Sequence, residues 1–156
     1  MMTVVTSTQL VTSTQLVTVG YEGRSADEIV AELSAAGVAI LIDVRLTPLS
    51  RKPGLSKRQL SQQLHRAGIR YIHLPSLGNP RGNRDRFRAN DPAALDKFRE
   101  ILRAPAGAKG VEEMAELAEG TTVALLCFER ESHRCHRQLI ADRLHELYPH
   151  LTVRHV

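Results

Sequence analysis

The stretch of residues 38–45, "VAILIDVR", places five apolar residues in a row before an aspartate. A strand that is apolar at every position is typical of a parallel sheet that is covered on both faces. Residues 121–128, "TTVALLCF", have the same character. We therefore expect a parallel sheet at the centre of the fold, with helices packed on each side.

Strands and amphipathic helices alternate around these two stretches. Further strands are predicted over residues 16–21, 69–75 and 151–156, and helices over residues 26–36, 57–67, 92–103, 111–118 and 132–148. Residues 76–91 are predicted as a long loop. The alternation predicts an α/β fold class: a mainly parallel five-stranded sheet with helices on both faces, in three layers.

A chain of 156 residues predicts one domain, which we place at residues 17–156. Before it, "VTSTQL" occurs twice in succession, at residues 5–10 and 11–16. Uncharged Thr, Ser and Gln residues bury little apolar surface, so we expect residues 1–16 to be a disordered or ragged extension. An extra edge strand is the structural alternative, because Thr and Val suit strands.

Composition narrows the class of partner. The net charge is +4 and the sequence pI is about 9.4, which favours an anionic or phosphate-bearing substrate and makes nucleic acid a possible partner. The longest apolar runs are the length of strands, so no membrane partner is expected. Two cysteines and the lack of a signal peptide point to the reducing cytoplasm. No oligomeric state follows from the sequence.

The ends of the predicted strands carry the ionisable side chains. In an open parallel sheet, ligands bind just beyond the carboxyl ends of the strands. These ends carry Tyr21, Glu22, Arg24, Asp43, Arg45, His73, Cys127 and Glu129. Asp43 leaves an apolar strand beside Arg45, which would keep the carboxylate ionised. It is either a candidate general base or a structural partner of that arginine.

Cys135 is the first candidate for a reactive thiol. With Ser132 as the N-cap of the last helix, Cys135 lies in its first turn, where the helix dipole favours a thiolate. Arg134, His136 and Arg137 surround it. Cys127, at the end of a buried strand, is the second candidate. Each cysteine could instead be a small buried apolar residue.

A metal site is a further alternative. Cys127, Cys135 and three histidines, His133, His136 and His73, could supply soft ligands. The spacing Cys-x7-Cys is not usual for zinc, however, so we predict no metal and no cofactor. A disulfide between the two cysteines is not expected in a reducing compartment, although an oxidation switch is possible.

Two basic segments, residues 50–58 and 81–88, follow the second and third predicted strands and should frame the site. Arginine suits phosphate and carboxylate groups. The predicted substrate-binding residues are Tyr21, Arg45, Arg51, Lys52, His73, Arg81 and Arg137. Aromatic residues make up only 4% of the chain, which argues against single-strand binding through base stacking. The sequence contains no Walker loop or dinucleotide fingerprint.

Together these features predict a small enzyme that acts on a nucleotide or nucleic-acid-like anion. Cys135 would be the nucleophile or redox thiol. Glu129 or Asp43 would be the general base, and His136 or His73 would assist proton transfer. The alternative from another class is a non-catalytic module that binds nucleic acid or a protein partner.

Four separated motifs resemble one known family. "TVGYEGRS", "LIDVRLTPLSRKPGLSK", "IRYIHLPSLGNPRG" and "LLCFERESHRCHRQLIADRL" resemble the domain-of-unknown-function 488 family in order and spacing, over roughly residues 18–156. The resemblance implies a site built from Asp43, Val44, Arg45, His73, Pro75, Cys127, Glu129, Cys135, His136 and Arg137.

A weaker likeness is to the rhodanese fold, through "LIDVR", "YIHLP" and "VALLC". It implies a sulfur carrier in which Cys127 holds a persulfide. Glu129 and Glu131 depart from that pattern, because they put negative charge into a loop that should receive an anionic sulfur donor.

Overall fold

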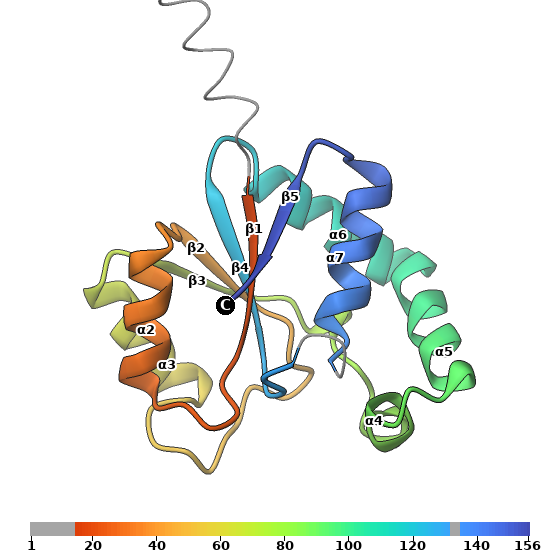
Figure 1. Ribbon diagram of the computed structural model, residues 1–156, viewed down its shortest axis with the longest axis horizontal. Helices are drawn as coiled ribbons and strands as arrows, with labels where there is room; N and C mark the ends of the chain where they lie inside the picture. Colours follow the sequence, from red (N-terminus) through yellow and green to blue (C-terminus); the bar gives the residue numbers. More distant parts are fainter. Residues whose placement is uncertain (1–14, 132–134) are drawn as a thin grey trace, which may run out of the picture.

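The computed structural model describes residues 15–131 and 135–156. Its five strands are β1 (Gln15–Gly20), β2 (Ile40–Asp43), β3 (Arg70–His73), β4 (Thr122–Cys127) and β5 (Thr152–His155). Every neighbouring pair is parallel, and the order across the sheet is β3-β2-β4-β1-β5 (Figure 1). The predicted five-stranded parallel α/β fold is therefore confirmed.

Helices cover both faces of the sheet, which gives the predicted three layers (Figure 1). The helical segments are α2 (Ala26–Ala35), α3 (Lys57–Arg66), the short 3-10 helix η1 (Pro75–Leu77), α4 (Arg81–Arg88), α5 (Pro92–Arg103), α6 (Pro105–Leu117) and α7 (Arg137–Leu147). Helices α2 and α3 contribute to one apolar cluster, and α4 to α7 contribute to the other.

The central strand β4 explains the continuous apolar pattern. Its residues alternate between the two clusters: Leu125 and Cys127 join the cluster with α4 to α7, and Ala124 and Leu126 join the cluster with α2 and α3. Both sides of the strand are dry, so neither can carry a polar residue at low cost. Cys127 therefore ends β4 on the face that α7 covers.

Several predicted boundaries were wrong. The basic segment predicted as a loop forms α4, which is held by the buried Phe87 and by Asn83, whose amide donates to the Ala94 carbonyl oxygen at 3.0 Å. Helix α6 begins at Pro105, earlier than expected, because proline suits the first turn of a helix. Strand β1 begins at Gln15, so the last two residues of the predicted extension belong to the sheet.

The start of the last helix also differs from the prediction. Helix α7 begins at Arg137, and the predicted cap Ser132 lies outside the described residues. Cys135 and His136 are held by contacts to β4 and to the residue after β2, and they precede the helix rather than form its first turn. The argument that placed Cys135 inside the helix dipole is therefore wrong.

The topology places a crevice at the carboxyl end of β4. From β1 and β2 the chain passes to α2 and α3 on one face, whereas from β4 it passes to α7 on the other (Figure 1). Such a reversal between neighbouring strands is where open parallel sheets bind ligands. None of the helices in the described part of the chain is long and apolar enough to cross a membrane.

Candidate functional site

A cavity of about 90 Å³ lies at this crevice. Its polar and sulfur-bearing lining side chains are Tyr21, Arg45, Thr47, Asn79, Arg84, Arg88, Cys127, Glu129 and His136. They come from the ends of β1, β2 and β4, from α4 and the segment before it, and from the residue before α7. The fold thus brings together five of the predicted site residues: Tyr21, Arg45, Cys127, Glu129 and His136.

Asp43 and Arg45 form a buried ion pair at the end of β2. The Asp43 carboxylate accepts hydrogen bonds from Arg45 Nε at 2.9 Å and Arg45 Nη2 at 2.7 Å, and also from the Tyr71 hydroxyl. Burial alone would lower the pKa of Arg45, but the hydrogen bonds and negative charge of Asp43 raise it above its usual value. Asp43 does not line the cavity, so its geometry matches the structural alternative, in which it positions Arg45.

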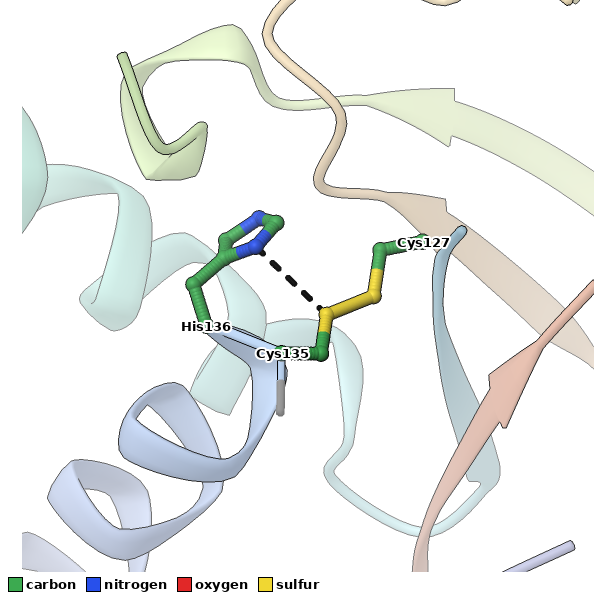
Figure 2. Close-up of side chains that lie close together, drawn as sticks. All are labelled: Cys127, Cys135 and His136. Carbon is green, nitrogen blue, oxygen red and sulfur yellow. Dashed lines mark hydrogen bonds between the residues drawn. A yellow bond between two sulfur atoms is a disulfide. The ribbon is translucent and has the colours of Figure 1, made fainter. Parts of the chain in front are cut away.

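The two cysteines meet at the end of β4. A disulfide joins Cys127 to Cys135, and each side chain is only 1% exposed. The expectation of no disulfide is therefore wrong, because the fold places Cys135, just before α7, against Cys127 at the end of β4 (Figure 2). Cys127 lines the cavity, whereas Cys135, which lies just before α7, is not one of its lining residues.

Arg137 is the fully buried cation beside this pair. Its Nη1 donates to the Cys127 sulfur at 3.3 Å and to the Glu129 carbonyl oxygen at 2.6 Å, and its Nη2 donates to the Arg130 carbonyl oxygen at 2.8 Å. Among the residues that the structure describes, no carboxylate forms an ion pair with it. Burial lowers the pKa of Arg137 to about 10, although the nearby charge of Glu129 opposes that shift.

His136 connects the cysteines to the end of β2. Its Nε2 lies 2.7 Å from the Val44 carbonyl oxygen, and its Nδ1 lies 3.5 Å from the Cys135 sulfur (Figure 2). Burial lowers the pKa of His136 to about 4, and the hydrogen bond to Val44 only partly opposes this. The ring is therefore neutral at pH 7.

The same three side chains could hold a metal ion if both cysteines were thiolates. The ligand atoms of Cys127, Cys135 and His136 lie within 4.8 Å of one another, a set of soft donors that suits Zn²⁺. His73 does not belong to this group, because its Nε2 lies 2.8 Å from the Arg45 carbonyl oxygen. His133 lies outside the described residues.

Five of the predicted substrate-binding residues do not line the cavity: Arg51, Lys52, His73, Arg81 and Arg137. Lys52 Nζ instead donates to the carbonyl oxygens of Tyr21 at 3.2 Å and Arg24 at 3.0 Å, which fixes the turn after β1. Arg51 and Arg81 are exposed.

Arg84 and Arg88 of α4 are the cations that sequence reasoning missed as site residues. Arg88 Nε donates to Glu129 Oε1 at 2.8 Å, and Arg84 Nε donates to the Asn79 carbonyl oxygen at 3.3 Å. Their spacing of four residues places both on one face of a helix, beside the buried Phe87. That signal was hidden because the segment was read as a loop.

Fold and site together define a small parallel α/β protein with a cysteine pair and a cationic pocket at the carboxyl edge of its sheet. The family model described as domain of unknown function DUF488 matches residues 25–144, so the chain belongs to that family. The match spans the site from Asp43 to Arg137. No curated protein and no solved structure matches the chain.

Proposed function

We propose that this chain is an enzyme that acts on a small anionic group at the carboxyl-edge cavity, with the reduced thiolate of Cys127 as the attacking group. The observation that carries the proposal is the contact between Cys127 and Arg137: a sulfur that lines the cavity accepts a hydrogen bond from a buried guanidinium. A cation in contact favours the thiolate, which is the nucleophilic form.

Arg84 and Arg88 are the groups that would hold the anion. Both line the cavity, and Arg84 makes no ion pair with any carboxylate in the described residues. Glu129, which pairs with Arg88 and lines the same space, is the proposed general base. A volume of about 90 Å³ suits a carboxylate or phosphate group rather than a whole nucleotide, so a larger substrate would insert only its anionic end.

A reducing compartment such as the cytoplasm fits this proposal, because Cys127 attacks only when the disulfide is open. A nucleic acid could present a phosphate to the same cavity. The basic residues outside the cavity, Arg51 and Arg81, are exposed and available to a longer anionic partner.

Selective alkylation tests the proposal without a known substrate. Iodoacetate and iodoacetamide have similar size, but only the first is an anion. In the reduced protein, Cys127 should react faster with iodoacetate than with iodoacetamide, as measured by mass spectrometry of the labelled peptide. Arg84→Gln should lower that ratio of rates about tenfold. Arg86→Gln is the matched control on the exposed side of α4 and should leave the ratio unchanged.

Two results would overturn the proposal. One is a Cys127 thiol that stays inert to both reagents until the protein unfolds. The other is an equal iodoacetate preference in the wild type, the Arg84 variant and the Arg86 variant, because the selectivity would then not come from the cavity.

A further inference from the structure

The two sulfurs have different positions relative to the cavity. Cys127 lines it, whereas Cys135 does not line it and is joined through its sulfur to Cys127 (Figure 2). A substrate that enters the cavity therefore meets Cys127 first. Cys135, which does not line the cavity, is placed to attack the Cys127 sulfur.

His136 supplies a base to the Cys135 sulfur. A carbonyl oxygen only accepts hydrogen bonds, so the neutral ring must carry its hydrogen on Nε2, where it donates to the Val44 carbonyl oxygen at 2.7 Å. The lone pair of Nδ1 then lies 3.5 Å from the Cys135 sulfur. When the disulfide is open, the Cys135 thiol can pass its proton to this nitrogen.

Arg137 supplies a counter-charge to the Cys127 sulfur. Its Nη1 contacts Cys127 at 3.3 Å, and its Nε has no hydrogen-bond partner in the described part of the molecule. A buried cation without a carboxylate partner is costly unless an anion forms beside it. In the reduced protein a thiolate on Cys127 would be such an anion, 3.3 Å from Arg137 Nη1.

This division of roles restricts the chemistry. An acyl or phosphoryl adduct on Cys127 is resolved by attack on its carbon or phosphorus atom, so a second thiol against the Cys127 sulfur would not help. An adduct joined through sulfur is resolved by attack on the Cys127 sulfur itself. The contact between Cys127 and Cys135 therefore suits a substrate that contains a sulfur–sulfur bond.

From these contacts we infer that the cysteine pair is a two-step thiol relay that reduces a small anionic disulfide. The inference rests on the proposed function, whose cavity and anion-binding arginines it uses. The Cys127 thiolate attacks one substrate sulfur, a mixed disulfide forms, and the other half of the substrate leaves as a thiolate. Cys135 gives its proton to His136 Nδ1 and attacks the Cys127 sulfur. The second half leaves and takes that proton from His136.

The electrons of this reaction balance without a cofactor. One substrate disulfide gains two electrons and becomes one thiolate and one thiol, and the Cys127 thiolate and the Cys135 thiol lose two electrons and become the Cys127–Cys135 disulfide. The structure holds this oxidised end state. A cellular thiol reductant would open the disulfide again by the reverse exchange.

Dithiodiglycolate, a small disulfide with a carboxylate at each end, is the probe. Protein that has been reduced and freed of reductant should release two thioglycolates per chain in two phases, and should end as the internal disulfide with no adduct. Cys135→Ser should release one thioglycolate and keep the other as a mixed disulfide on Cys127. Hydroxyethyl disulfide, the uncharged analogue, should react with the wild type at least about tenfold more slowly.

His136→Gln separates the relay from a simple exposed thiol. The glutamine amide can still donate to the Val44 carbonyl oxygen, but it cannot act as a base. The second phase should slow about 10²-fold, far more than the first phase. His145→Gln is the control, since His145 lies exposed on the same helix, α7, and both phases should match the wild type.

Several outcomes would overturn the relay. They are a stable adduct on the wild type, release of two thioglycolates by Cys135→Ser, and first attack by Cys135. Another is tight binding of Zn²⁺ that blocks both thiols until a chelator is added, which would make the pair metal ligands. If Cys135→Ser does not fold, Cys135→Ala and the two phases of the wild type give the same test. Failure of the relay with an intact iodoacetate preference leaves the proposed function standing, whereas loss of both removes both.

Discussion

The ends of β2 and β4 each bury an arginine, and each surrounds it differently. Arg45 at the end of β2 has a two-pronged carboxylate partner, Asp43, which raises its pKa. Arg137 beside the end of β4 has two carbonyl oxygens and a sulfur, and burial lowers its pKa. In the first arrangement the charge of the arginine is balanced by a carboxylate, and the pair has a structural role. Among the described residues the second has no carboxylate in an ion pair with it, and a reacting thiol can supply a negative charge.

The largest expected effect comes from removing the anion at β2. Asp43→Asn keeps the shape of the side chain but leaves the Arg45 charge buried without a partner, which should lower the free energy of unfolding by about 3–5 kcal/mol. Urea unfolding followed by circular dichroism measures this loss. Asp96→Asn, which breaks the exposed pair with Arg99, is the matched control and should cost less than about 1 kcal/mol.

A double variant sharpens the comparison. Adding Arg45→Met to Asp43→Asn removes the unpaired charge, so it should restore part of the lost stability. An Asp43→Asn loss no larger than the Asp96→Asn loss would show that the end of β2 does not depend on this ion pair, and the contrast with the end of β4 would fail.

The next largest effect is a loss of stability in acid that comes from His136, which lies beside the end of β4. In the unfolded chain His136 binds a proton as the pH falls through its usual pKa of about 6.5. In the folded protein burial lowers that pKa to about 4. Between these values the unfolded state binds more protons, so stability falls as the pH is lowered. The contribution of His136 to this fall should be about 3 kcal/mol between pH 7 and pH 4.

His136→Gln isolates this contribution, because other groups also titrate in that range. The variant should lose less stability than the wild type between pH 7 and pH 4, by about 3 kcal/mol in urea unfolding. His65→Gln on the exposed side of α3 is the control and should follow the wild type. Parallel pH curves for wild type and His136→Gln would mean that the imidazole is not held neutral beside the cysteines.

The part of the site that the sequence predicted is the part set by strand ends. Apolar runs identify β2 and β4, and a parallel sheet brings the residues after them to one edge, so Asp43, Arg45, Cys127 and Glu129 follow from pattern alone. The basic segment 81–88 was expected to frame the site, but its helical form, α4, and the choice of Arg84 and Arg88 as lining residues could not be predicted in this way. That helix has little apolar periodicity and depends on tertiary contacts of Phe87 and Asn83.

The different surroundings of the two cysteines also could not be predicted from the sequence. Both stand in a basic, histidine-rich segment, and charge counting favoured Cys135. Only the folded structure shows that Arg137 contacts Cys127 and that His136 contacts Cys135. All four residues lie within a stretch of eleven positions, so the sequence alone does not show which sulfur contacts the arginine and which contacts the histidine.

The smallest expected effect concerns the hydrogen bond from Tyr71 to Asp43 at the end of β2. Tyr71→Phe removes one hydrogen bond to the Asp43 carboxylate and should cost about 1.5 kcal/mol of unfolding free energy, at the lower end for a bond to a charged group. Tyr148→Phe is the control, because no hydroxyl hydrogen bond is found for Tyr148 among the described residues. In the Asp43→Asn background the cost of Tyr71→Phe should shrink, since the acceptor charge is gone.

The iodoacetate preference of Cys127 should not change in either tyrosine variant. A change in that preference with Tyr71→Phe would mean that the ends of β2 and β4 act as one electrostatic unit rather than two.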